Sequence, residues 1–253
     1  MPNTCVLLFA DTFQHPFNAS KNNVRKIISI GIDLKSSKAA IEIARVHKHI
    51  FATIGIHPHD IDNVNENTYA SLRKLFSQYS DHIVGYGEIG LDYFKNYSDP
   101  ANQRKHFIKQ LDLANELELP VIIHNRQADD DTLKILQKAK PFTHGGILHC
   151  FSGDYEIACK IMDLGLLISI PGVVTFKNAA TLHDVVKKVP LTSIVLETDG
   201  PFLSPHPFRG KRNEPAYIPY IAEKIAQIRE IDTRQVADQT TLNAENLFKI
   251  LYL

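Results

Sequence analysis

The stretch that decides the fold is residues 83–93, IVGYGEIGLDY, in which an apolar run ends in charged side chains. Ile, Val and Leu occur in this run without strict alternation between apolar and polar positions. Such a pattern is typical of a parallel β-strand that is covered on both faces. The sequence therefore predicts a buried strand over residues 83–91, with polar side chains toward its end.

The rest of the chain repeats this arrangement of an apolar run followed by a helical pattern. Further apolar runs cover residues 5–11, 25–32, 50–57, 119–124, 145–150, 166–171 and 193–199. Between most of them, apolar residues recur every three or four positions, as on one face of an amphipathic helix. A clear example is the series Ile218, Ile221, Ile225 and Ile228.

Eight predicted strands that alternate with helices in 253 residues predict an α/β fold, a single-domain (β/α)8 TIM-type barrel over residues 1–253. A doubly wound open sheet is the competing layout. The segment between Asp11 and Arg25 is too short for a full loop, helix and return, and Pro16 interrupts it. We therefore expect a distorted barrel in which the first helix is truncated or missing.

The composition is that of an ordinary soluble globular protein, with 44% hydrophobic and 22% charged residues. The 28 basic and 28 acidic residues cancel, so a phosphate-binding surface has to be a local patch. The apolar runs are far shorter than the roughly 20 residues of a membrane-spanning helix, and the N-terminus lacks a signal-peptide pattern. Three cysteines without metal-type spacing fit a reducing compartment. We expect a cytoplasmic protein with no membrane partner.

Ionisable residues stand at the ends of four of the predicted strands. They are Glu88, His124, His149 and Asp199. In a barrel the carboxyl ends of the strands open onto one face, so these side chains would converge there. Imidazole and carboxylate groups are ligands for Zn, Mn or Mg, and buried ionisable groups are costly unless they are paired or bound to a metal. We interpret the set as a metal site; a purely structural polar network is the alternative.

Two more histidines, His57 and His59, follow the third predicted strand in the stretch 55–59, GIHPH. On an extended segment both side chains would point to the same side. Pro58 favours a turn equally, and a turn would splay them. We take His57 as a site residue, and His59 is the weaker candidate.

A basic motif, residues 208–215 (FRGKRNEP), follows the last predicted strand. Its cations Arg209, Lys211 and Arg212 surround a glycine and are suited to hold phosphate oxygens. A solvated surface loop is the alternative, but the position after Asp199 favours function. Arg126 would point the same way as His124 if that strand continues. The chain carries no dinucleotide-binding glycine motif, no P-loop and no nucleophile elbow.

These motifs together resemble the TatD-type metal-dependent deoxyribonucleases, a family of amidohydrolase-like barrels. The similar stretches are residues 55–59, 87–93, 148–153 (LHCFSG), 197–199 (ETD) and 209–215. The resemblance implies that Glu88 bridges two divalent metals, that His124 and His149 bind one of them, and that Asp199 binds the other. It further implies hydrolysis of DNA phosphodiester bonds, often from the 3′ end.

The first motif of this family is altered in the chain. The family usually opens with Asp-Thr-His-x-His, whereas residues 11–15 read DTFQH, so Phe13 replaces a histidine ligand. His15 is then the remaining histidine for the second metal. We expect one or two divalent ions (Mg, Mn or Zn) per chain.

Our hypothesis from the sequence is a 3′-5′ exonuclease that acts on DNA, single-stranded or at ends. Asp199 would orient or deprotonate the attacking water, with Glu88 as the other catalytic carboxylate. His57 and the basic side chains named above would bind the substrate. A hydrolase of a small ester, amide or phosphoester is one alternative, but it has no use for the basic motif. A catalytically weakened binding module is the other, and Phe13 is the feature in its favour.

Overall fold

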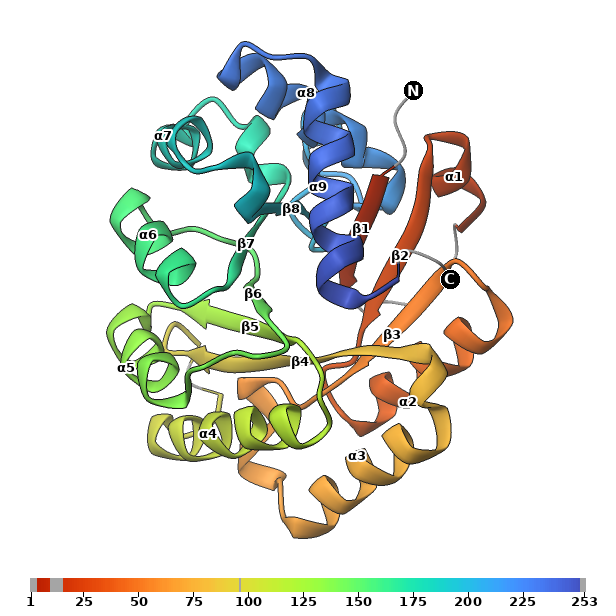
Figure 1. Ribbon diagram of the computed structural model, residues 1–253, viewed down its shortest axis with the longest axis vertical. Coiled ribbons are helices and arrows are strands. Elements are labelled where there is room, and N and C mark those ends of the chain that lie inside the picture. Colours follow the sequence, from red (N-terminus) through yellow and green to blue (C-terminus); the bar gives the residue numbers. More distant parts are fainter. Residues whose placement is uncertain (1–3, 10–15, 96, 251–253) are drawn as a thin grey trace. The chain divides into compact units, whose positions relative to one another are not determined.

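The computed structural model describes residues 4–9, 16–95 and 97–250, with the side chains of residues 19–95 and 97–250. Strands and helices alternate along this part of the chain (Figure 1). The strands are β1 (Thr4–Phe9), β2 (Val24–Ile30), β3 (Ile50–Ile54), β4 (Ile83–Asp92), β5 (Val121–Arg126), β6 (Gly146–Leu148), β7 (Leu167–Ile170) and β8 (Ile194–Leu196).

The helices between the strands have these bounds: α1 (Pro16–Lys21), α2 (Leu34–Val46), α3 (Glu66–Tyr79), α4 (Pro100–Glu116), α5 (Asp129–Ala139), α6 (Tyr155–Asp163), α7 (Ala180–Lys188), α8 (Ile218–Arg229) and α9 (Thr233–Phe248). Five short 3₁₀ helices lie in the connections of the described chain: η1 (Pro58–Asn63), η2 (Ser80–His82), η3 (Gly172–Thr175), η4 (Leu191–Ser193) and η5 (Pro215–Tyr217). In the residues that the structure describes, no helix is both long enough and apolar enough to span a membrane.

The strands follow one another in the sheet in chain order, from β1 to β8. A doubly wound sheet reverses its strand order part-way, so this sequential order excludes the competing layout and is that of a (β/α)8 barrel. Helix α1 has only six residues, which confirms the expected truncation of the first helix. Strands β3, β6 and β8 end two or three residues before the predicted runs do, so His57, His149 and Asp199 lie just beyond their strands.

The chain divides into two compact units, which are described separately. The first consists of Met1–Ile28, Cys150–Met162 and Leu167–Leu253, and the second of Ser29–His149 and Asp163–Leu166. The single-domain organisation stays a prediction.

In the second unit, strands β3 to β6 pair in parallel, each with its successor in the chain. Helix α2 packs on β3 and helix α4 packs on β4. All residues of β3 and β4 are buried, as expected for parallel strands with few polar positions. The carboxyl ends of these strands therefore lie along one edge of a tightly packed layer, which holds the polar side chains there in fixed positions.

In the first unit, β7 and β8 pair in parallel, and helix α9 packs against β1 and β8. The predicted apolar face of α8 is buried at Ile218, Ile221 and Ile225 and is partly buried at Ile228. The amphipathic pattern in the sequence thus identified the inner face of this helix.

One glycine allows β4 and β5 to approach closely beside the site. Gly90 has a φ of +143°, and a Cβ there would collide with the main-chain carbonyl oxygen of His124. Only glycine tolerates both the backbone conformation and this contact. Gly165 also has a positive φ, +77°, but a Cβ there would meet no other atom.

We expect Gly90→Ala to lower the free energy of unfolding by about 3 kcal/mol or more, because a left-handed strain is added to a backbone clash. The matched variant Gly165→Ala carries the strain alone and should cost about 1 kcal/mol. Urea unfolding of both variants measures the difference. Equal losses of stability would show that the contact at His124 imposes no constraint.

Candidate metal centre

The site is built around Glu88, whose side chain is 1% exposed in the fully buried strand β4. Its amide N–H donates to the carbonyl oxygen of Gly31 at 3.0 Å. Thr53 on β3 holds the preceding peptide, because its Oγ1 donates to the carbonyl oxygen of Gly87 at 2.5 Å. The position of the carboxylate is therefore fixed by neighbouring strands of the second unit.

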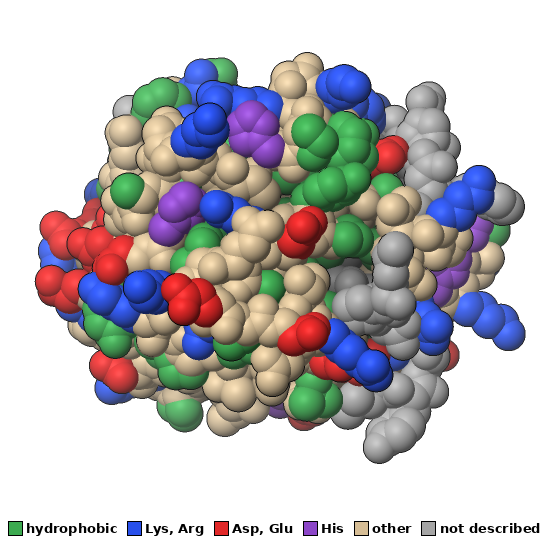
Figure 2. Space-filling view, turned by 90° about the horizontal axis from the view of Figure 1, so that it is seen from above, with side chains coloured by type: hydrophobic (Ala, Val, Ile, Leu, Met, Phe, Trp, Pro, Cys, Tyr) green, Lys and Arg blue, Asp and Glu red, His purple; other side chains and the backbone are tan. Residues whose placement is uncertain are grey.

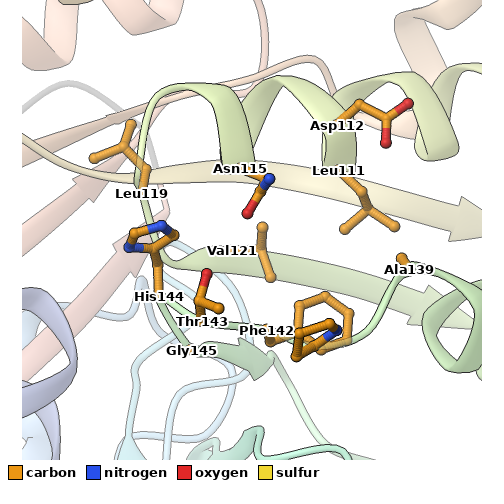
Figure 3. A pocket seen from close by; sticks show the side chains of 11 residues that line it. Leu111, Asp112, Asn115, Leu119, Val121, Ala139, Phe142, Thr143, His144 and Gly145 are labelled. Carbon is orange, nitrogen blue, oxygen red and sulfur yellow. The ribbon is translucent and has the colours of Figure 1, made fainter.

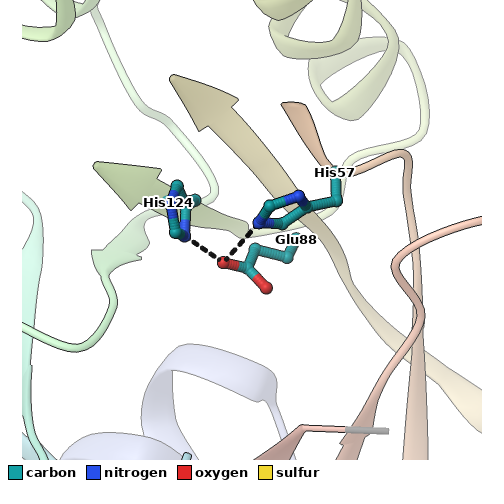
Figure 4. Close-up of side chains that lie close together, drawn as sticks. All are labelled: His57, Glu88 and His124. Carbon is teal, nitrogen blue, oxygen red and sulfur yellow. Dashed lines mark hydrogen bonds and ion pairs between the residues drawn. The ribbon is translucent and has the colours of Figure 1, made fainter. Parts of the chain in front are cut away.

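Three imidazole rings surround one oxygen of this carboxylate. Glu88 Oε1 lies 2.6 Å from Nδ1 of His124, 2.8 Å from Nε2 of His149 and 3.6 Å from Nε2 of His57. His57 and His124 approach it from two sides in Figure 4. His149 and His124 are themselves 3.4 Å apart, between Nε2 and Nδ1. These four side chains come from separate strands of one unit or from the residues that follow them. The structure thus brings together three of the five residues predicted as metal ligands, Glu88, His124 and His149, and adds His57.

The tautomer of His124 follows from its two partners. Its Nε2 lies 3.1 Å from Oδ2 of Asp92, which can only accept, so the N–H is on Nε2. In the neutral ring Nδ1 then carries a lone pair that points at Glu88 Oε1, 2.6 Å away. Two acceptors at this distance repel unless a proton or a metal cation lies between them. The geometry of this contact therefore calls for a cation.

The pKa shifts within the cluster also favour a positive charge beside Glu88. Burial alone would raise the pKa of Glu88, but the surrounding imidazoles outweigh it and hold that pKa well below its ordinary value. Burial lowers the pKa of His57 to about 3, so this ring is neutral. Burial also lowers the pKa of His124, but Glu88 and Asp92 overcome this and raise it above its ordinary value. These shifts favour the ionised form of Glu88 and the protonated form of His124.

The donor set fits a divalent metal. Glu88, His124 and His149 supply its donor atoms. His57 lies beside them, in a group with Glu88 and His124 whose ligand-type atoms are within 4.8 Å of one another. Neutral imidazole and carboxylate are the donors that zinc and related ions take in catalytic sites. A metal would replace the proton on His124 and relieve the contact between two acceptors.

The tautomer of His57 separates it from the other two histidines. The amide of His59 donates to Nδ1 of His57 at 3.1 Å, so in the neutral ring the proton sits on Nε2. A protonated nitrogen cannot ligate a metal, but it can donate a hydrogen bond to an anion. This agrees with the role in substrate binding that the sequence predicts for His57.

The expectation that a turn at Pro58 would splay His57 and His59 is wrong. The turn is present, because η1 begins at Pro58. Nevertheless, the two ring centroids lie only 4.4 Å apart. The hydrogen bond from the His59 amide to the His57 ring folds the segment back on itself, so both rings stay beside the cluster.

Asp92, the last residue of β4, is the functional residue that sequence reasoning missed. Its Oδ2 accepts from Nε2 of His59 at 2.9 Å as well as from His124. Burial raises the pKa of Asp92, but hydrogen bonds from His124 and the Lys95 amide hold it well below its ordinary value. A carboxylate that orients a metal-binding histidine is a common feature of metal sites. The signal was present in the sequence, since Asp92 lies four residues after Glu88 at the same strand end.

The remaining predicted residues of the strand-eight segment lie in the first unit. Asp199 follows β8 with a φ of +54°, in the left-handed region. The basic motif is tied to this segment by Asn213, whose Nδ2 donates to the carbonyl oxygens of Thr198 and Phe202 at 2.5 and 2.7 Å. Its three cations are exposed, and the guanidinium of Arg209 lies 4.6 Å from the ring centroid of Phe176. Asp199 and the basic motif are thus one connected segment.

Strand β5 continues to Arg126, as the prediction for that residue required. The side chain of Arg126 is exposed, and its guanidinium lies 3.9 Å from the ring centroid of Phe94. Phe13 and His15 lie outside the described residues. The metal-ligand role of His15 therefore stays a prediction.

In the described part of the chain, surface charge is mixed and a further pocket lies away from the metal centre. The face drawn in Figure 2 carries acidic and basic side chains side by side, in keeping with the equal totals of 28 each. A pocket of about 280 Å³ lies at the amino ends of β5 and β6, between α4 and the loop before β6 (Figure 3). Asp112, Asn115 and His144 line it beside apolar side chains. It is at the opposite ends of the strands from Glu88.

Comparison with known proteins identifies the family. A model of the family described as TatD related DNase matches residues 8–249. The chain belongs to this family. It is 41% identical over 232 residues to the uncharacterized metal-dependent hydrolase YabD of Bacillus subtilis, covering 92% of this chain and 90% of that protein. It is 35% identical over 238 residues to the 3′-5′ ssDNA/RNA exonuclease TatD of Erwinia tasmaniensis, with 92% and 91% covered.

A solved structure shows the same fold. The crystal structure of YJJV, a TatD homologue from Escherichia coli K12, superimposes with a TM-score of 0.90 at 26% identity, over 97% of this chain and 98% of that one. This confirms the predicted barrel fold. Membership of the family makes the chain a metal-dependent hydrolase, and the His and Glu cluster of the second unit is a group suited to hold the metal.

We expect Asp92→Asn to weaken the affinity for the divalent metal about 10- to 100-fold. The amide oxygen still accepts from the main chain, but the carboxylate that holds the N–H of His124 is gone. Titration of the metal-depleted protein with Mn²⁺, followed by calorimetry, measures the loss. Asp112→Asn, at an exposed position on α4, is the control and should leave the affinity unchanged. Affinities within twofold for both variants would remove Asp92 from the metal centre.

Proposed function

We propose that the protein hydrolyses phosphodiester bonds of DNA and removes nucleotides from the 3′ end of single strands. The observation that carries the proposal is the buried Glu88 carboxylate, one oxygen of which is shared by three imidazoles. Metal-assisted hydrolysis of phosphodiesters needs such a set of anionic and neutral donors. Membership of the TatD related DNase family and the similarity to the ssDNA/RNA exonuclease of Erwinia tasmaniensis support DNA as the substrate.

In this proposal Glu88, His124 and His149 would hold the divalent ion, and Asp199 and His15 would be ligands of a second one. A bound ion would supply Lewis-acid polarisation of the phosphoryl group and a more acidic water. His124 keeps the tautomer that Asp92 imposes, with its Nδ1 lone pair directed toward Glu88.

The remaining residues act on substrate and water. His57 donates its Nε2–H to a non-bridging oxygen of the scissile phosphate, which the amide of His59 favours by occupying Nδ1. Asp199 accepts a proton from the attacking water, whose oxygen bonds to phosphorus while the bond to the 3′ oxygen breaks, and the 3′ oxygen takes a proton from solvent and leaves as a hydroxyl. Arg126, Arg209, Lys211 and Arg212 hold phosphates of the strand and offset the charge of the transition state.

A single-stranded oligonucleotide labelled at its 5′ end tests the proposal. With Mg²⁺ or Mn²⁺ we expect a ladder of products shortened from the 3′ end, and no products with a chelator. Glu88→Gln should lower the rate at least about 10³-fold, because it removes the charge that holds the metal. Glu116→Gln, at an exposed ion pair with Arg73, is the control and should keep full activity.

Two results would contradict the proposal. Full activity of Glu88→Gln after metal-free purification would exclude the metal mechanism. Hydrolysis of small esters or phosphoesters by a protein that leaves every oligonucleotide intact would favour the small-substrate hydrolase instead.

A further inference from the structure

Two large side chains of the second unit are exposed immediately after the strand that carries Glu88. Phe94 is 47% exposed and Tyr97 is 65% exposed, although β4 itself is fully buried up to Asp92. Two aromatic rings left in water next to a buried polar cluster are unfavourable, because their apolar surface gains no free energy from burial. Aromatic rings placed in this way are typical of a surface that binds a flat ligand.

Phe94 is accompanied by cations. The guanidinium of Arg126 lies 3.9 Å from its ring centroid, and Nζ of Lys95 lies 5.4 Å from it. Both are cation–π contacts, which hold the cations close to the ring while their charge remains exposed. An aromatic surface bordered by cations is complementary to a ligand that combines flat rings with phosphate groups.

Tyr97 connects this surface to the cluster around Glu88. Its ring meets the ring of His59 edge to face, with centroids 4.8 Å apart at 84°. The rings of His59 and His57 are in turn 4.4 Å apart, and those of His57 and His124 are 4.6 Å apart. A continuous series of rings therefore leads from the exposed Tyr97 to the metal centre.

Asp92 connects the turn that carries Phe94 to the histidines of the cluster. Its Oδ2 accepts from His59 and His124, while its Oδ1 accepts from the amides of Phe94 and Lys95 at 2.9 and 3.0 Å. The turn that carries the exposed ring and the histidines of the cluster thus share one buried carboxylate. This leaves the position of Phe94 relative to Glu88 little freedom.

We propose that Phe94 and Tyr97, flanked by Arg126 and Lys95, form a stacking platform for unpaired bases of single-stranded nucleic acid next to the scissile phosphate. One base stacks on the ring of Tyr97 and another on the exposed part of the Phe94 ring, beside the guanidinium of Arg126, and the two cations hold the phosphates between them. In a duplex the faces of the bases are already stacked on one another, so the platform selects single strands over paired ends. The inference rests on the proposed nuclease function and names the residues that bind the bases of its single-stranded substrate.

Binding of fluorescein-labelled oligothymidylate to the full chain, followed by fluorescence anisotropy in Ca²⁺, tests the platform. We expect Phe94→Ala and Tyr97→Ala each to raise Kd about tenfold, as for loss of a stacked base. Tyr97→Phe should restore the affinity because the ring is retained. Tyr155→Ala, at an exposed aromatic residue on α6 of the first unit, is the matched control and should leave Kd unchanged.

An abasic strand of the same length separates stacking from charge. We expect the wild type to bind it more weakly than oligothymidylate, and Phe94→Ala to bind it as the wild type does. In cleavage assays KM for oligothymidylate should rise about tenfold in the two alanine variants, with kcat within about twofold and the metal content unchanged.

Three outcomes overturn the platform. First, the alanine variants could bind oligothymidylate as tightly as the wild type does. Second, the alanine variants could lose as much affinity for the abasic strand as for oligothymidylate, which would assign the effect to charge or folding. The third is a wild type that neither binds nor cleaves any strand, which would overturn the proposed nuclease as well. If the wild type cleaves single strands and the alanine variants bind and cleave them equally well, the platform alone is overturned and the proposed nuclease function stands.

Discussion

The contact between Glu88 Oε1 and Nδ1 of His124, 2.6 Å long, is the interaction on which the rest of the site depends. The carboxylate is buried in a strand without exposed residues, so it cannot turn toward water. A buried charge is tolerated only when a partner compensates it. Because the Nε2–H of His124 is directed to Asp92, this ring compensates the Glu88 charge only through a second proton on Nδ1 or through a metal cation between the two side chains.

The need to compensate the buried Glu88 carboxylate is reflected in the hydrogen bonds of Asp92, His57 and His59 around it. Asp92 orients two histidines with one oxygen and the following turn with the other. The amide of His59 determines which nitrogen of His57 carries a proton, so one ring of the cluster becomes a donor while His124 keeps a lone pair for a metal. The two histidines therefore have different roles, because in each ring a hydrogen bond to one nitrogen determines whether the other carries a proton.

Periodicity was sufficient to predict the order of strands and helices, since buried parallel strands leave continuous apolar runs such as residues 83–91. It also predicted that Glu88, His124 and His149 would meet, because they end strands that are adjacent in the sheet. It could not predict that His57 and His59 remain together across a turn, or that Asp92 supports the cluster. These depend on hydrogen bonds between side chains far apart in the sequence, such as the one that joins His59 and Asp92, and no local pattern encodes them.

The most direct test is a crystal of the protein grown with Mn²⁺ and measured at the absorption edge of that metal. We expect an anomalous peak about 2.0–2.3 Å from an oxygen of Glu88 and from Nδ1 of His124, typical of a metal–ligand bond. We also expect His57 Nε2 to stay outside the coordination shell. A metal bound elsewhere, with Glu88 and His124 still in direct hydrogen-bond contact, would show that this pair is not the metal site.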